Sequence, residues 1–200
     1  MLRALRARGL PVVFDGRPAA PLPGDVWVDN DHAATTAAVL DHLAASGARR
    51  IALHAGYGRE HYTGAVTAAH ARWCAERGRP ALVVPFDPED AAGHAFAAPG
   101  RPDAVYCVYD PGGRQVLAAA ARHGIRTPGD LLLVCASEDP AYGSHEPAVT
   151  TVTLHPERIA VTAMSALVTL IESGQAESPG QYTVPTGQRV RASSLPPDMY

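Results

Sequence analysis

Lysine is absent from this 200-residue chain, and all 17 of its basic residues are arginine. The absence excludes a Schiff-base lysine and the lysine of a phosphate-binding P-loop. Genomic base composition is the plainer explanation of an arginine-only chain. The formal charge of −3 also gives no basic surface of the kind that binds nucleic acid or an anionic membrane.

Cysteine is scarce, with three residues in the chain: Cys74, Cys107 and Cys135. Two of them lie inside apolar, strand-like runs. An odd count without close spacing is typical of small buried side chains in a reducing compartment. The nine histidines contain no compact pair with a third ligand nearby, so we expect no metal site.

Long hydrophobic runs are also missing. The N-terminal residues 1–8 lack the apolar core of a signal peptide, and no stretch approaches the length of a membrane span. A hydrophobic content of 46% over 200 residues is ordinary for one large or two small globular domains. These features predict a cytoplasmic protein.

Short β-branched runs alternate with longer amphipathic stretches along the whole chain. Continuous apolar strands with covering helices predict an α/β fold of doubly wound parallel sheets, buried on both faces. Strands are expected at 10–14, 26–28, 51–54, 81–84, 104–108, 131–135, 149–152, 182–184 and 189–191. Helices are expected at 1–8, 31–46, 62–77, 88–97 and 113–123, and from 155 to the stop at Gly174.

Ligands of doubly wound sheets bind beyond the carboxyl ends of the strands. Several loops of this chain follow such ends and carry side chains that could hold a small molecule. The candidates are Tyr57, Arg59, His61 and Tyr62 in the first loop, Phe86 in the second, Tyr109 and Asp110 in the third, and Ser137 and Glu138 in the fourth. The aromatic side chains of the first loop suit stacking on a flat ring, and Arg59 suits an acidic or polar group.

Each of these loops also has a purely structural interpretation. The first could be exposed to solvent, with its aromatic side chains capping the sheet. Asp110, which precedes Pro111, suits a helix N-terminal cap, and a cap is compatible with ligand contact. Ser137 and Glu138 could equally belong to a solvated acidic loop.

Catalytic motifs are missing from the sequence. It contains no Gly-x-Ser-x-Gly turn and no Gly-x-Gly-x-x-Gly after the first strand. Gly112-Gly113 opens an expected helix and could hold an anion, but two glycines alone are weak evidence. We therefore expect a binding protein without a cofactor rather than an enzyme.

The order of several short motifs resembles a known family. Val28-Asp29-Asn30 precedes a long helix, Gly47-Ala48-Arg49-Arg50-Ile51-Ala52 follows it, and Tyr109-Asp110 ends a later strand. Gly124-Ile125-Arg126-Thr127-Pro128-Gly129-Asp130 forms a turn, and Pro147-Ala148-Val149-Thr150-Thr151-Val152 leads into the last helix. Over residues 1–193 the sequence resembles the sensor domain of lactose-repressor-type (LacI/GalR) transcription regulators.

The resemblance implies a two-lobed, periplasmic-binding-protein-like fold that closes around a small-molecule effector, and a homodimer. It places residues 1–46 and 153–180 in an incomplete N-terminal lobe, and residues 47–152 and 181–200 in the C-terminal lobe. Asp29 is expected to face the cleft or to cap the helix that follows it. Such regulators bind DNA through an N-terminal helix-turn-helix headpiece, which is expected only in a longer parent protein.

Several polar positions of the family's effector site carry other residues in this sequence. Val66 stands where the family has an arginine, Tyr109 replaces an asparagine, and Ser137 replaces an aspartate. Leu154 stands at a position that is often polar, whereas Asp110 is kept. These replacements argue against a simple sugar as the effector. The effector classes that stay open are sugars in general, nucleosides, and aromatic or acidic metabolites.

A solute-binding protein of a transport system shares the two-lobed fold and is the alternative. The missing signal segment argues against it, and the segments Thr150-Thr151-Val152 and Gly47-Ala48-Arg49-Arg50 favour a regulator. We therefore expect the sensor part of a cytoplasmic, repressor-type transcription regulator.

Overall fold

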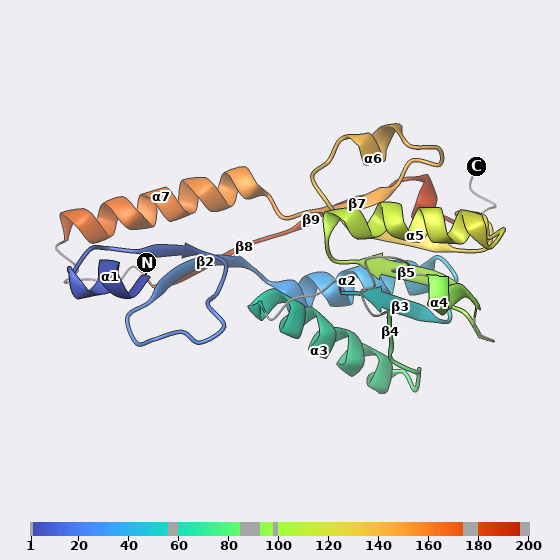
Figure 1. Ribbon diagram of the computed structural model, residues 1–200, viewed down its shortest axis with the longest axis horizontal. Helices are drawn as coiled ribbons and strands as arrows, with labels where there is room; N and C mark the ends of the chain where they lie inside the picture. Colours follow the sequence, from blue (N-terminus) through green and yellow to red (C-terminus); the bar gives the residue numbers. More distant parts are fainter. Residues whose placement is uncertain (1, 56–59, 85–92, 98–99, 174–179, 197–200) are drawn as a thin grey trace.

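The computed structural model describes residues 2–55, 60–84, 93–97, 100–173 and 180–196 (Figure 1). The helices are α1 (Leu2–Ala7), α2 (His32–Ala45), α3 (His61–Glu76), α4 (Gly93–Ala97), α5 (Asp110–Arg122), α6 (Ala141–Ser144), α7 (Pro156–Glu172) and the 3-10 turn η1 (Ala192–Ser194). The strands are β1 (Val13–Asp15), β2 (Val26–Asn30), β3 (Ile51–His54), β4 (Leu82–Val84), β5 (Ala104–Cys107), β6 (Leu132–Ala136), β7 (Thr150–Thr153), β8 (Gln181–Val184) and β9 (Gly187–Arg189).

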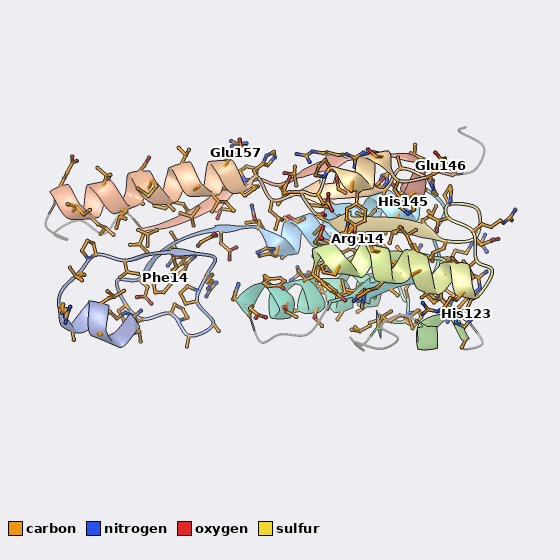
Figure 2. The ribbon with its side chains drawn as sticks, turned by 45° about the horizontal axis from the view of Figure 1, so that its top comes forward. Phe14, Arg114, His123, His145, Glu146 and Glu157 are labelled. Atoms are coloured by element: carbon orange, nitrogen blue, oxygen red, sulfur yellow. The ribbon has the colours of Figure 1, made fainter. Side chains whose placement is uncertain are left out.

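The strands form two separate sheets, which define a smaller and a larger lobe. The smaller sheet has the order β1-β2-β8, and the larger has the order β4-β3-β5-β6-β7-β9. Every neighbouring pair is parallel except β7 and β9. The two lobes lie end to end along an elongated molecule, with Phe14 in the smaller lobe and Arg114 at the start of α5 in the larger one (Figure 2). The predicted two-lobed, doubly wound architecture is confirmed.

Helices cover both faces of the larger sheet. On one face, side chains of α2 and α3, including Leu40 and Trp73, pack with Leu53 and Val134. On the other face, side chains of α5 pack with alternate residues of the same strands, such as Val105. Burial on both faces explains why these strands read as continuous apolar runs in the sequence.

The larger sheet reverses its winding between β3 and β5, which are neighbours in the sheet. The chain leaves β3 for α3 on one face and leaves β5 for α5 on the other. The two connections therefore diverge, and they open a crevice beyond the carboxyl ends of these strands.

Helix α7 covers one face of the smaller sheet. Its Ile159 packs with Val28 and Val184, and its Ala166 and Leu170 pack with Val26. The opposite side of the helix is exposed and carries large apolar side chains: Val161, Met164, Val168 and Ile171.

Three short segments connect the lobes: Asp31, residues 154–155 and residues 185–186. The side-chain amide of Asn30 joins all of them, because its nitrogen donates to the carbonyl oxygens of Leu154 (3.1 Å) and Val184 (2.8 Å). His155 has a φ of 52°, a left-handed conformation that non-glycine residues rarely adopt. The three crossings thus form one hydrogen-bonded hinge.

The lobe boundaries differ from those expected. Residues 32–45, expected in the N-terminal lobe, form α2 and contribute Leu40 and Leu43 to the core of the larger lobe. Residues 181–184, expected in the C-terminal lobe, form β8 and pair with β2 in the smaller sheet. The reason is that the chain crosses directly at the ends of β2 and β8, and the apolar side of a helix does not reveal which sheet it covers.

Three smaller points complete the fold. The short helix α6 has no counterpart among the expected elements. Cys74, Cys107 and Cys135 are free and buried, as expected. Within the described part of the chain, no helix is both long and apolar enough to span a membrane.

Candidate functional site

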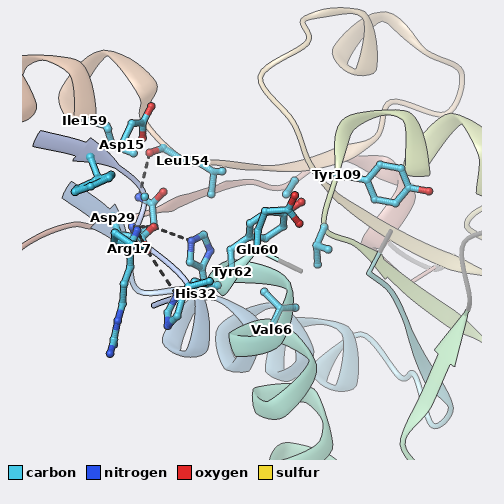
Figure 3. A pocket seen from close by; sticks show the side chains of 18 of the residues that line it. Asp15, Arg17, Asp29, His32, Glu60, Tyr62, Val66, Tyr109, Leu154 and Ile159 are labelled. Carbon is cyan, nitrogen blue, oxygen red and sulfur yellow. Dashed lines mark hydrogen bonds and ion pairs between the residues drawn. The ribbon is translucent and has the colours of Figure 1, made fainter. Parts of the chain in front are cut away.

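A cavity of about 950 Å³ lies between the two lobes, beyond the carboxyl ends of β1, β2, β5 and β6 (Figure 3). Its volume is within the range of small-molecule sites. The lining residues are Phe14, Asp15, Gly16, Arg17, Pro18, Ala19, Asp29, Asn30, His32, Glu60, His61, Tyr62, Val66, Tyr106, Val108, Tyr109, Asp110, Ala136, Leu154 and Ile159. Both lobes and the hinge therefore contribute to one cavity.

Asp29 makes several polar contacts in the cavity wall. Its carboxylate accepts hydrogen bonds from the backbone N–H groups of Arg17 (2.9 Å) and Asn30 (2.8 Å). The Nε2 atom of His32 lies 2.9 Å from the same carboxylate. The Nδ1 atom of His61, in the larger lobe, lies 3.9 Å from it, so Asp29 links the two walls.

The pKa of Asp29 is lowered in this setting. Burial alone acts to raise it, but the hydrogen bonds from His32 and from the backbone of Arg17 and Asn30 outweigh burial. Asp29 is therefore ionised in the cavity. The cap of α2 comes from Asp31 instead, whose carboxylate accepts from the backbone N–H of Ala34 at 2.8 Å.

Aromatic and aliphatic side chains form the rest of the wall. The rings of His32, at the start of α2, and Tyr62, in α3, approach each other on the larger-lobe side of the cavity, with centroids 5.8 Å apart and planes inclined at 45°. Val66 and Leu154 line the same cavity. These two positions, which the resemblance marks as usually polar, here present apolar surface.

Tyr109 lines the cavity, but its ring is directed away from it (Figure 3). Its hydroxyl donates to Gln115 Oε1 at 2.6 Å and lies 2.9 Å from His54 Nε2. Gly112 makes room for this packing, because a Cβ there would lie 2.9 Å from the Tyr109 ring. Burial lowers the pKa of His54, against opposing hydrogen bonds from Gln115 and from the backbone of Val84. The Tyr109 hydroxyl thus serves a buried contact.

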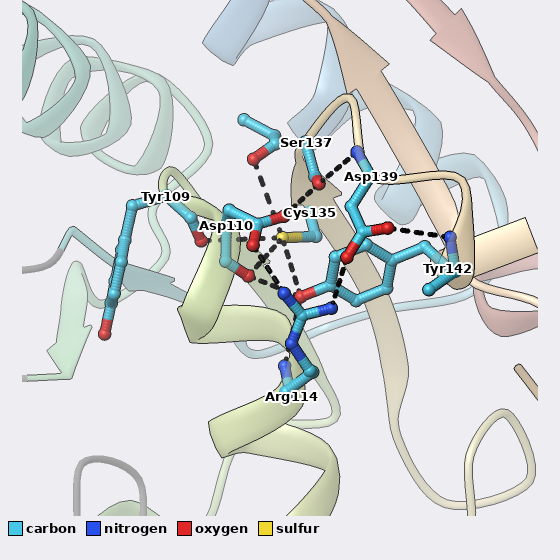
Figure 4. A network of polar contacts seen from close by, with 9 residues as sticks. Tyr109, Asp110, Arg114, Cys135, Ser137, Asp139 and Tyr142 are labelled. Carbon is cyan, nitrogen blue, oxygen red and sulfur yellow. Dashed lines mark hydrogen bonds and ion pairs between the residues drawn. The ribbon is translucent and has the colours of Figure 1, made fainter.

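Asp110 belongs to a polar network at the start of α5 (Figure 4). It accepts hydrogen bonds from the Ser137 hydroxyl and, at 2.6 Å, from Arg114. Arg114 also donates to Asp139 at 2.8 Å, and the Tyr142 hydroxyl donates to the Asp110 carbonyl. The network fixes the loop after β6 against α5.

Glu138 holds the hinge instead of facing the cavity. Its Oε1 accepts hydrogen bonds from the Thr153 hydroxyl and, at 2.9 Å, from the backbone N–H of Leu154. Its Oε2 lies 3.3 Å from the guanidinium of Arg189 on β9. Glu138 therefore fixes the segment through which the chain crosses from β7 to α7.

The structure brings together five of the sequence candidates as cavity-lining residues: Asp29, His61, Tyr62, Tyr109 and Asp110. Ser137 and Glu138 are not among the lining residues. Tyr57, Arg59 and Phe86 lie outside the described residues, so their roles stay predictions. Sequence reasoning missed Asp15, His32 and Glu60 as site residues, although the strand-end rule applied to the first expected strand points to Asp15.

Residues 40–194 match the model of the periplasmic binding protein-like domain. The chain belongs to this family. Its fold is that of the effector-binding domains of LacI-type regulators, and solved structures of such proteins superpose on nearly its whole length. The comparison with curated proteins found no significant match to this chain.

The solved structures similar to this periplasmic binding protein-like domain include a putative LacI-family regulator from Sanguibacter keddieii. It is 26% identical, with 96% of this chain and 82% of that chain covered and a TM-score of 0.83. The transcriptional regulator CelR in complex with cellobiose is also 26% identical, with 96% and 61% covered and a TM-score of 0.84. A putative LacI regulator from Bacillus cereus is 21% identical, with 96% and 71% covered and a TM-score of 0.86.

Proposed function

We propose that this domain is the sensor of a bacterial LacI-type transcription regulator, and that a small-molecule effector binds in the cavity between its lobes. The observation that carries the proposal is that both lobes build one cavity of about 950 Å³ beside a three-segment hinge. The cellobiose complex of the similar regulator CelR supports it. The proposal assigns DNA binding to a headpiece outside this domain.

The hinge gives the proposal its mechanism. A ligand that touches Asp29 on the wall of the smaller lobe and Tyr62 on the wall of the larger lobe binds the closed arrangement more tightly than the open one. Its binding free energy then shifts the population toward the closed state. In the parent protein, closure changes the spacing of the headpieces and with it the affinity for DNA.

The proposal includes a homodimer that works in the cytoplasm. The supporting feature is the exposed face of α7, where Val161, Met164, Val168 and Ile171 repeat at intervals of three and four residues. The charged residues of this helix are confined to its two ends. Such a stripe suits packing against the same helix of a second copy. Met164→Glu is expected to shift the molar mass measured by light scattering toward the monomer.

Thermal unfolding with a panel of sugars, nucleosides and aromatic acids tests the effector site. At least one compound is expected to stabilise the domain, by ~2.7 kcal/mol at a hundredfold excess over its Kd. The double variant His61→Ala/Tyr62→Ala should lose this stabilisation, whereas the exposed His123→Ala should keep it. A stabiliser whose effect survives the double variant contradicts the site.

DNA binding by the parent protein tests the regulatory role separately. A regulator is expected to change its affinity for its operator when the stabilising compound is added. A solute-binding protein of a transport system, the alternative, shows the same thermal stabilisation but no operator binding in fluorescence anisotropy.

A further inference from the structure

The side chains around the cavity offer many hydrogen-bond acceptors and few free donors. Four carboxylates line it: Asp15, Asp29, Glu60 and Asp110. The amide nitrogen of Asn30 is used by two carbonyl oxygens of the hinge, and the Tyr109 hydroxyl donates to Gln115. Among the described lining residues, His32, His61, Tyr62 and Tyr106 are the remaining side-chain donors besides arginine, and His32 already faces Asp29.

Arg17 does not neutralise these carboxylates. It contributes its backbone N–H to Asp29, while its guanidinium lies 5.5 Å from the centre of the Trp27 ring. Trp27 is not a lining residue of the cavity. Figure 3 shows the Arg17 side chain running away from Glu60 and Leu154. Its charge therefore belongs to the outer surface of the smaller lobe.

The four carboxylates differ in their partners. Asp29 has His32, and Asp110 has Arg114 and Ser137. Neither Asp15 nor Glu60 makes a side-chain hydrogen bond or ion pair with any other described residue, and Glu60 precedes α3 without a side-chain capping bond. One of them comes from each lobe, so the two unpaired negative charges face a ligand from both walls.

Closure over a neutral ligand leaves these two charges without a counter-charge in a smaller and drier space, which is costly. A protonated amine offers three donors, no acceptor and one positive charge. The ring of Tyr62 adds a surface on which a cation is favourable.

We infer that the effector is a cationic amine, of the amino-sugar type, whose ammonium group pairs with Glu60 or Asp15. The inference rests on the proposed function, because it names the ligand class of the same cavity. The sequence-based expectation is that Arg59 takes an acidic or polar group, and an acidic group would give the ligand the opposite charge. Arg59 lies outside the described residues, so ligand charge is the measurement that decides between the two.

Three β-1,4-linked disaccharides or disaccharide derivatives of different charge provide the test. The β-1,4-linked dimer of glucosamine is positive, cellobiose is neutral, and cellobionate is negative. Isothermal titration calorimetry at about pH 6, where carboxylates are ionised and the amines are protonated, gives the affinity of each. The amine is expected to bind at least ~tenfold more tightly than cellobiose, which corresponds to ~1.4 kcal/mol. Added salt should lower the affinity for the glucosamine dimer more than the affinity for cellobiose.

Glu60→Gln and Asp15→Asn test the assignment of the charge. At least one of them is expected to lower the affinity for the glucosamine dimer by about fivefold or more and to raise that for cellobiose, because the uncompensated charge is gone. Glu172→Gln, an exposed change at the end of α7, is the matched control. A thermal unfolding transition measured without ligand establishes that each variant is folded. Because the two variants lie on different lobes, the test stays decisive if one of them fails to fold.

The outcomes separate this inference from the proposed function. Equal or tighter binding of cellobiose or cellobionate overturns the cationic ligand and leaves the effector site standing. Binding of the amine that neither carboxylate variant weakens overturns the assignment to Glu60 and Asp15. If none of the three disaccharides binds, the amino-sugar inference is wrong. The wider panel of sugars, nucleosides and aromatic acids then decides the proposed function by itself.

Discussion

The side-chain nitrogen of Asn30 donates a 2.8 Å hydrogen bond to the carbonyl oxygen of Val184, a residue 154 positions further along the chain. The same nitrogen reaches the carbonyl of Leu154, so one amide joins the ends of β2, β7 and β8. Asn30 is 7% exposed, so its two N–H groups are largely shielded from water. The hinge therefore depends on the side-chain amide of Asn30. No other side chain of the same size and shape offers two N–H donors at this position.

Asn30→Asp should destabilise the domain. The change keeps the size of the side chain but replaces two donors by carboxylate oxygens that face two carbonyls. Leaving buried groups unpaired costs ~1–3 kcal/mol each, so we expect a loss of at least that size in the free energy of unfolding. Urea unfolding measures it. The matched change Gln181→Glu, on the exposed side of β8, should have little effect, and equal midpoints for Asn30→Asp and the unmodified domain would argue against the hinge role.

Gly113→Ala should destabilise the start of α5. A Cβ at this position would lie 2.5 Å from the hydroxyl oxygen of Tyr142, which donates to the Asp110 carbonyl. Overpacking of this kind costs ~1–3 kcal/mol. Gly64→Ala in α3 is the control, because nothing lies within 4 Å of the new Cβ and alanine favours a helix by ~0.5–1 kcal/mol. Opposite signs in thermal unfolding are the expected result, and stabilisation by Gly113→Ala would refute the contact.

The stability of the domain should fall as the pH drops below about 6.5. His54 and His70 are fully buried, and burial lowers the pKa of each below the ordinary 6.5. As the pH falls, these histidines therefore bind protons in the unfolded chain at a higher pH than in the folded one. The stability that the neutral rings contribute is complete above 6.5 and is lost as the pH falls toward their folded values.

His70→Gln tests this pH dependence away from the cavity. Each histidine adds a slope of up to ~1.4 kcal/mol per pH unit, so the variant should lose less stability than the unmodified domain between pH 7.5 and 5.5. Urea unfolding at both values gives the difference. His123→Gln, a change of an exposed side chain, is the control, and an unchanged slope in His70→Gln would rule out its contribution.

Glu138→Gln should act on hinge closure and not on ligand recognition. The change removes the negative charge beside Arg189 and weakens the hold on Thr153 and the Leu154 N–H. We expect the affinity for every cavity ligand to change by a similar factor, so that the ratio between the glucosamine dimer and cellobiose is kept. Calorimetry measures that ratio. A change confined to one ligand would instead support the original prediction that Glu138 contacts the effector.

Much of the fold was predictable because burial imposes a regular pattern. Residues 51–54 read as a strand from their apolar run and are β3 with both faces covered. The strand-end rule also pointed to the cavity. Asp29 lies at the carboxyl end of β2, Tyr109 follows β5, and both line the cavity. What the rule could not supply is the lobe to which α2 belongs, because the same apolar side fits either sheet.

The directions of the polar side chains were harder to predict. Ser137 and Glu138 follow β6 as the rule requires, yet their partners Asp110 and Thr153 lie elsewhere in the sequence. Tyr109 is directed away by His54, a contact that depends on the missing Cβ of Gly112. Such preferences are set by tertiary hydrogen bonds, which a linear pattern does not contain.

The three hinge crossings are one or two residues long and share the amide of Asn30. A ligand shifts the balance between open and closed forms only by the difference of its affinities for the two. A molecule that contacts one wall alone, such as the smaller-lobe wall with Asp15 and Asp29, gains nothing from closure. It occupies the cavity and excludes the effector without sending a signal. Short fragments of the true effector should therefore behave as antagonists, and the length of a ligand, more than its affinity, separates activation from blockade.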